Sequence, residues 1–253
     1  MSDDRLVLAA ADGVLTLALN RPDKRNAIDT AMIEALHAAL DRAELDAAVR
    51  VVVVRGAGKD FCAGADLAEL LDSADRTADE NRAQAQRLGD VFVRIRSLPK
   101  PVLAVVQGRA LAGGCGLATA CDLVLAHEDA QFGYPEVRRG FVPAMVMAML
   151  RRATGEKAAF DLVATGRILS AAEACQLGLV SRVLTATTFE TDVAEVAGML
   201  AAQSATALAL IKRQLYELDG RSFADGIRLG AEVNAVARAT PDFRAAIAAF
   251  LNR

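Results

Sequence analysis

The residues best suited to chemistry lie in the stretch 98–143. A run of β-branched and aliphatic side chains at 102–106 predicts a strand that is buried on both faces. Gly113, Gly114 and Gly116 follow it and open a stretch of good helix formers. The first N–H groups of a helix have no backbone partners and lie at the positive end of its dipole, so they attract an anion or a developing oxyanion. Glycines at this point also let a ligand approach the backbone closely.

A dinucleotide-binding fingerprint is one interpretation of this cluster. Gly114 and Gly116 fit the first two glycines of such a fingerprint, but Thr119 stands in the third place. The acidic residue expected about 20 positions further on would be Glu136. Because Glu136 sits in a Tyr-Pro-Glu turn and not at the end of a strand, a nucleotide-dependent oxidoreductase is a distant alternative.

Two other interpretations are a phosphate-binding P-loop and an oxyanion hole. The P-loop requires Gly-Lys followed by Ser or Thr, whereas Gly58-Lys59 is followed by Asp60. An oxyanion hole needs backbone N–H donors aimed at one acyl oxygen, and Gly113 or Gly114 could supply one of them. The sequence therefore favours acyl chemistry over phosphate binding at this turn.

A second glycine turn, FCAGADL at residues 61–67, could supply the other donor. It follows a predicted buried strand at 51–55 and also opens a helix. Two strand-turn-helix units of this kind can aim two N–H groups at one point. Glu136 follows Pro135, which fixes the turn, and by position alone it is as typical of a turn or helix-start acid as of a catalytic one.

Five segments together carry a resemblance to a known family. They are NRPDKRNAID, FCAGADL, LPKPVLAVVQGRALAGGCGLATACDL, FGYPEVRRGFVP, and AAEACQLGLVSRV at 171–183. In this order the chain resembles the enoyl-CoA hydratase/isomerase (crotonase) superfamily over essentially its whole length. The resemblance implies an α/β fold, a crotonase-like spiral of ββα units with a C-terminal helical trimerisation module. It divides the chain into a core at 1–188 that binds acyl-CoA and performs catalysis, and a helical module at 189–253.

The resemblance also implies the catalytic residues. The N–H groups of Ala63 and Gly113 would bind the thioester oxygen, and Glu136 would transfer protons. Many hydratases of this family carry a second glutamate directly after Gly-Gly-Cys, where this chain has Gly116. We expect Gly116 to leave extra room for a branched acyl chain.

Further contacts with the acyl-CoA are implied for ten residues. From the sequence alone, the basic cluster of Arg21, Lys24 and Arg25 is typical of a solvated turn, but the resemblance places it near the CoA phosphates. The implied substrate-binding residues are Lys24, Arg25, Ala65, Asp66, Leu67, Gly114, Gly116, Pro135, Phe250 and Arg253.

We therefore expect an enoyl-CoA hydratase that works through an enolate with one catalytic glutamate. A Δ3,Δ2-enoyl-CoA isomerase is the first alternative, since one carboxylate suits a proton shuttle between C2 and C4. A non-catalytic acyl-CoA-binding protein is the second alternative. The resemblance implies no cofactor, because coenzyme A is part of the substrate, and implies a homotrimer or a hexamer made of two trimers.

Composition argues against several other classes of protein. The net charge of −3 argues against a nucleic-acid surface, and no apolar run is long enough to span a bilayer. The acidic start MSDDR lacks the order of a signal peptide, and the four cysteines have no C-x-x-C spacing. These features predict a cytoplasmic protein with free thiols. With only two histidines, a histidine-based metal site is not expected.

Hydrophobic periodicity predicts the remaining elements. A helix is expected from a cap at Asp29 or Thr30 to about Leu45. The polar, Ala-rich stretch 72–90 predicts a helix that could act as a lid over the acyl end of the pocket. A strand is expected at 179–183. The chain after Phe189 is predicted to be entirely helical, with helices at 188–202, 205–218, 222–238 and 242–251.

Overall fold

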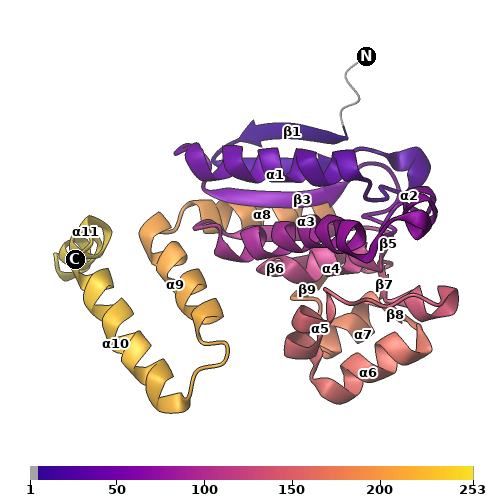
Figure 1. Ribbon diagram of the computed structural model, residues 1–253. Coiled ribbons are helices and arrows are strands. Elements are labelled where there is room, and N and C mark those ends of the chain that lie inside the picture. Colours follow the sequence, from indigo (N-terminus) through magenta and orange to yellow (C-terminus); the bar gives the residue numbers. More distant parts are fainter. Residues whose placement is uncertain (1–4, 253) are drawn as a thin grey trace.

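The computed structural model describes residues 5–252, and its centre is a six-stranded sheet with the order β1-β2-β3-β4-β6-β9 (Figure 1). β1 and β2 form an antiparallel hairpin, and the later neighbours in this sheet pair in parallel. The strands are β1 (Leu6–Ala11), β2 (Val14–Leu19), β3 (Val51–Gly56), β4 (Val102–Val106), β6 (Leu123–His127) and β9 (Arg182–Leu184).

Helices follow or separate most of the strands. The helices of the main body are α1 (Thr30–Leu45), α2 (Leu67–Asp72), α3 (Ala78–Ser97), α4 (Gly113–Ala120), α5 (Met147–Thr154), α6 (Glu156–Thr165), α7 (Ala171–Gln176) and α8 (Phe189–Ala201). Short 3-10 turns lie at Pro22–Lys24 (η1), Ser73–Asp75 (η2) and Pro135–Arg139 (η3).

Both faces of the main sheet are covered. Val52 and Val54 of β3 belong to a large core that also contains buried side chains of α1, α3 and α4. The alternate residues Val51 and Val53 pack on the other face in a smaller core with α8. This arrangement explains why β4 is buried along its whole length, as its apolar run predicts. The division at residue 188 stays a prediction, although α8 beyond it packs on the sheet.

A second, three-stranded sheet carries the glycine cluster and the Pro-Glu turn. β5 (Arg109–Leu111) pairs in parallel with β7 (Gln131–Gly133), and β7 pairs antiparallel with β8 (Ile168–Ser170). The sequence did not predict these three strands, because three residues are too few to show an alternating pattern.

The last three helices are α9 (Ala205–Glu217), α10 (Phe223–Ala239) and α11 (Pro241–Leu251), and they extend away from the main body (Figure 1). α9 is anchored by the buried Lys212, which forms an ion pair with Asp122 and donates to the carbonyl oxygen of Ile95. Tyr216 donates to the other oxygen of Asp122. Asp122 therefore has a structural role, because it holds α9 against the main body.

The predicted helices of the C-terminal region match the structure within about two residues, which is the usual uncertainty of helix ends. The first helix is also as predicted, with Asp29 accepting from the Met32 N–H at its N-terminus. The stretch 72–90 is not the single helix that was predicted. η2 ends at Asp75, and a new helix, α3, begins at Ala78 with a capping box of Thr77 and Glu80. The predicted strand at 179–183 lies three residues later, at Arg182–Leu184.

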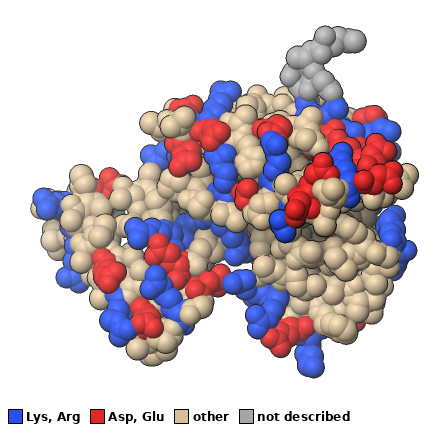
Figure 2. Space-filling model, in the orientation of Figure 1, with Lys and Arg blue, Asp and Glu red and all other residues tan. Residues whose placement is uncertain are grey.

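The surface has no dominant charge on the face shown in Figure 2, where acidic and basic side chains are interspersed. Within residues 5–252, no single helix is long and apolar enough to cross a membrane. α8 and α9 pass that test only as a pair, and they are bent by 99° relative to each other.

Candidate active site

Three parallel segments end side by side at the predicted site. Cys62 forms a parallel bridge with Ala110 of β5, and β5 pairs in parallel with β7. Each segment is followed by one of the turns singled out in the sequence: 63–66, 112–113 and 134–136. Because parallel neighbours end at the same edge, the second glycine turn, the start of α4 and the Pro-Glu turn meet there.

The N–H of Ala63 does not face this edge. It donates to the carbonyl oxygen of Arg25 at 3.0 Å. On the same side of the turn, the Ile28 N–H donates to Gly64 and the Asp66 N–H donates to Ile28. The structure therefore corrects the prediction for Ala63, whose N–H is already bound by the N-terminal loop.

The N–H of Ala65 faces the other way, toward α4. In the parallel bridge between Ile28 and Ala65, Ile28 bonds to the residues on either side of Ala65 and not to Ala65 itself. A Cβ placed on Gly113 would lie 3.9 Å from the Ala65 nitrogen. Among residues 5–252, no hydrogen bond uses the N–H of Ala65 or of Gly113. These two amides therefore form a pair of unsatisfied donors, with Gly113 as predicted and Ala65 in the place predicted for Ala63.

Glycine is required at two positions for close packing between the turns. Gly64 has a φ of +101°, and a Cβ there would lie 2.8 Å from the Ala112 Cβ. A Cβ on Gly114 would lie 2.3 Å from the Cys62 carbonyl oxygen. Gly114 thus lets α4 begin directly against the turn at 61–67, and its expected contact with substrate stays a prediction.

Glu136 brings a half-buried carboxylate to the same edge. It is the second residue of η3, after Pro135, and its Oε2 is buried with no hydrogen-bond partner among the described residues. Burial raises the pKa of the Glu136 carboxyl above its usual range, and its own backbone amide and Arg139 oppose that shift. A carboxylate in this state is suited to accept and return a proton near neutral pH.

A buried polar contact fixes the Pro-Glu turn against α4. Tyr134 is fully buried and its hydroxyl lies 3.1 Å from the Thr119 hydroxyl, which donates to the Cys115 carbonyl oxygen. The Ala112 N–H also donates to the Gly133 carbonyl oxygen. Two links thus hold the strand end that carries Glu136 beside the helix that begins at Gly113.

Gly116 does not leave the extra room expected from the sequence. A Cβ there would lie 2.1 Å from Cγ1 of Val146 and 3.5 Å from Cζ of Phe92. Val146 and Phe92 are both buried, so an apolar wall fills the space beside Gly116. The sequence reasoning missed these residues because nothing in the sequence relates 92 and 146 to the glycine cluster.

The buried thiols beside the turns are not nucleophiles. Burial raises the pKa of Cys62 to about 12 and the pKa of Cys115 to about 11. Both side chains therefore stay neutral at pH 7, and a neutral thiol neither attacks a thioester nor binds a metal well. In the chain from residue 5 to 252, no group of three or more His, Cys, Asp or Glu is arranged to hold a metal ion.

The predicted residues of the N-terminal loop divide into two groups. Arg21 bonds to Asp66 and Asp29, and Asp66 also caps α2. The side chains of Arg21 and Asp66 are thus used within the protein. Lys24 and Arg25 are exposed on and beside η1, where they are open to a ligand.

Three other residues were predicted to contact the acyl-CoA: Leu67, Phe250 and Arg253. Leu67 begins α2 and is exposed. Phe250 lies on α11, at the opposite end of the molecule from β5 and β7 (Figure 1). Arg253 lies outside the described residues.

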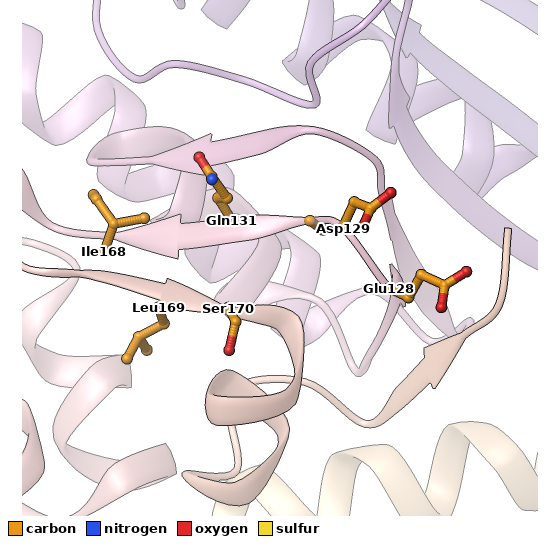
Figure 3. Close-up of a pocket in the computed structure, with 7 residues that line it drawn as sticks. Glu128, Asp129, Gln131, Ile168, Leu169 and Ser170 are labelled. Atoms are coloured by element: carbon orange, nitrogen blue, oxygen red, sulfur yellow. The ribbon is translucent and has the colours of Figure 1, made fainter.

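A separate hollow of about 340 Å³ lies where the turn after β6 meets β7 and β8 (Figure 3). Its lining is mixed acidic, polar and apolar: Glu128, Asp129, Ala130, Gln131, Ile168, Leu169 and Ser170. It contains none of the predicted site residues, so the structure gives no reason to connect it with the acyl chemistry.

Comparisons with known proteins identify the family of the chain. The sequence matches the family described as "Enoyl-CoA hydratase/isomerase" over residues 9–253. The chain belongs to the enoyl-CoA hydratase/isomerase family. It is 44% identical over 240 residues to a putative enoyl-CoA hydratase of Thermus thermophilus, covering 95% of each chain. It is 34% identical over 249 residues to the 2,3-dehydroadipyl-CoA hydratase of Escherichia coli, covering 98% of this chain and 96% of that protein.

Solved structures of this family confirm the predicted fold. The crystal structure of an enoyl-CoA hydratase from Mycobacterium smegmatis matches with a TM-score of 0.93 at 33% identity, covering 98% of this chain and 96% of that one. Human enoyl-CoA hydratase domain-containing protein 3 matches with the same TM-score at 28% identity, covering 98% and 97%. The protein is thus an enzyme-family member with the crotonase fold and the C-terminal helices expected for it.

The wall beside Gly116 can be tested by adding one methyl group. Gly116→Ala should lower the free energy of unfolding by about 1–3 kcal/mol, because the new Cβ overlaps Val146. Val146→Ala in the same chain should recover part of that loss. The control is Gly198→Ala in α8, where a Cβ meets nothing within 4 Å and alanine should add about 0.5–1 kcal/mol. If Gly116→Ala and Gly198→Ala change the free energy of urea unfolding equally, Val146 does not fill the space beside Gly116.

The buried state of Glu136 predicts how stability depends on pH. Because its pKa is raised in the folded protein, the folded state binds this proton more tightly, and stability falls as pH rises through the raised pKa. Glu136→Gln should therefore stabilise the protein at neutral pH, and the gain should vanish below the usual value of 4.5. Denaturant unfolding from pH 4 to 8 measures both.

Glu173 provides a control of opposite sign. The Ser170 backbone N–H and then its hydroxyl lower the Glu173 pKa in the capping box of α7. Its contribution is present at neutral pH and is lost as pH falls through its folded pKa. Glu173→Gln should thus destabilise at neutral pH. A destabilising Glu136→Gln would show that the carboxylate has a charged partner in the folded protein.

Proposed function

We propose that the protein is an enoyl-CoA hydratase with an acyl-CoA thioester as its substrate. The observation that carries this proposal is the meeting of two unsatisfied amides, Ala65 and Gly113, with the unpaired carboxylate of Glu136 at one edge. The names of the hydratases to which the chain is similar support the choice of reaction. This assignment replaces the Ala63 amide with that of Ala65 and keeps the other two predicted groups.

In this mechanism the two amides bind the thioester oxygen. The Ala65 and Gly113 N–H groups stabilise the charge of the enolate more than that of the ground state, which is the condition for accelerating the chemical step. One such donor is typically worth about 2.7–4 kcal/mol of transition-state stabilisation. The N-terminus of α4 adds its positive dipole end to the same point.

Glu136 manages the protons. Its carboxylate orients a water molecule for attack at C3 and takes a proton from it, and a proton is delivered to C2 from the same face. The wall of Val146 and Phe92 occupies the place beside Gly116 where a second acid would have to stand, so one carboxylate handles both transfers. The apolar wall also keeps the local dielectric low, which strengthens the hydrogen bonds to the enolate.

Isomerisation of a 3-enoyl-CoA remains the alternative, since a single carboxylate also suits proton transfer from C2 to C4. A non-catalytic acyl-CoA-binding protein would keep the amides without needing the unpaired carboxylate. An unpaired buried acid destabilises the fold, and a protein that only binds acyl-CoA does not need one. The half-buried, unpaired Oε2 of Glu136 therefore favours catalysis over binding alone.

Purified protein incubated separately with a 2-enoyl-CoA and a 3-enoyl-CoA tests the reaction. We expect loss of the conjugated 2-enoyl absorbance, with kcat lowered about 10²–10⁴-fold in Glu136→Gln and KM nearly unchanged. Glu173→Gln, in the exposed capping box of α7, should keep the parent activity. Turnover of the 3-enoyl substrate alone would establish the isomerase, and binding without turnover of either would establish the non-catalytic alternative.

We further propose that the chain forms a homotrimer or a hexamer through its C-terminal helices. The support is the number of large apolar side chains that α10 and α11 expose. These side chains are Phe223, Ile227, Val236, Phe243, Ile247, Phe250 and Leu251. In an assembly, Phe250 would meet the substrate of a neighbouring subunit, since it lies far from the site of its own chain.

Sedimentation velocity tests the assembly. The parent should sediment with three or six times the mass of one chain, and Ile227→Glu on α10 should shift it to smaller species. The control is Phe160→Glu on α6, another exposed apolar residue, outside the C-terminal helices. A parent protein that sediments as a single chain would contradict the proposal.

A further inference from the structure

The side chain of Asn26 makes three hydrogen bonds within and beside the N-terminal loop. It is fully buried, and its Nδ2 donates to the carbonyl oxygens of Ala57 at 2.9 Å and Asp60 at 2.8 Å. Its Oδ1 accepts from the Arg21 N–H at 2.9 Å. One side chain thus joins the loop at 20–28 to residues 57–60, which lead into the glycine turn at 61–67.

The backbone at this point is held in an unfavourable conformation. Arg25 and Asn26 have φ values of +52° and +55°, in the left-handed region that residues other than glycine seldom adopt. Such a conformation costs about 1–2 kcal/mol for each ordinary residue, and Asn tolerates it best. The three side-chain bonds of Asn26 offset this cost and aim the Arg25 carbonyl oxygen at the Ala63 N–H.

The hydrogen bond from the Ala63 N–H to the Arg25 carbonyl oxygen sets the register between the loop at 20–28 and the turn at 61–67. When the Arg25 carbonyl oxygen accepts from the Ala63 N–H, the Ile28 N–H donates to the Gly64 carbonyl oxygen. The Ile28 carbonyl oxygen then accepts from the Asp66 N–H. The N–H of Ala65 is then left facing Gly113, because successive backbone amides in extended chain point to opposite sides. A slip of one residue would turn the Ala65 N–H toward the loop, away from Gly113.

We propose that Asn26 is a positioning residue for the reaction: by fixing the register of the 25–28 segment, it directs the Ala65 N–H toward the substrate oxygen. This inference rests on the proposed function of the Ala65 and Gly113 amides. Asn26 does not touch the substrate and acts only through the backbone of the turn. Displacing a reacting group by about 1 Å can reduce the rate about a hundredfold.

Asn26→Asp is the sharpest variant. It keeps the shape, the tolerance of positive φ and the acceptor for the Arg21 N–H, but it places an acceptor opposite two carbonyl oxygens. Asn26→Gly removes the side chain and keeps the backbone freedom, so it is the variant to use where Asp prevents folding. The control is Val193→Ala in α8, which removes buried apolar contacts on the far face of the main sheet.

Two readouts separate positioning from stability. The first is the division between kcat and KM with a 2-enoyl-CoA, and the second is the absorption band of a bound aryl-conjugated 2-enoyl-CoA. Hydrogen bonds to its carbonyl oxygen shift that band to longer wavelength. We expect the Asn26 variants to lose about a hundredfold in kcat with KM nearly unchanged and to lose most of the band shift. Val193→Ala should keep both at the parent values despite its lower free energy of unfolding.

The outcomes distinguish this inference from the proposed function. An inactive parent that does not shift the band would contradict the function itself. An active parent whose folded Asn26 variants keep its kcat and band shift would overturn the role of Asn26. If neither Asn26 variant folds, Asn26 acts through stability alone and the positioning role is withdrawn.

Discussion

The parallel pairing of short backbone segments is the constraint on which the site depends. The segments at 25–28, 62–66, 109–112 and 131–133 lie beside one another, and their hydrogen bonds decide which amides remain free. Backbone hydrogen bonds between these segments use the neighbouring amides and leave the Ala65 and Gly113 N–H groups unpaired, and the Asn26 side chain ties the segment at 25–28 to Ala57 and Asp60. The glycines at 64 and 114 are necessary for the same reason, since any Cβ there would separate the segments.

Burial gives this edge its chemical character. The free oxygen of Glu136, the neutral thiols of Cys62 and Cys115, and the apolar wall of Val146 and Phe92 all lie in a region with little water. In such a region an unpaired carboxylate holds its proton more readily and an amide hydrogen bond is stronger than in water. The features that destabilise the fold locally are therefore the features that favour proton transfer.

Much of this could be predicted from the sequence. The two glycine turns, the Pro-Glu turn and the long helices have strong local signals, and their order along the chain carried the family resemblance. The choice between Ala63 and Ala65 could not be made, because it depends on a pairing with residues about 40 positions earlier. The wall at Gly116 was missed for the same reason: a glycine suggests space, but only packing shows that Val146 fills it.

The buried ion pair of Lys212 and Asp122 has a mechanical consequence. Lys212 also holds the carbonyl oxygen of Ile95 near the end of α3, and the same helix carries Phe92 to the wall beside Gly116. A force applied to the projecting helices is therefore transmitted along α9 to α3. Breaking that charge pair would therefore loosen α9 from α3 and from Asp122 at the same time.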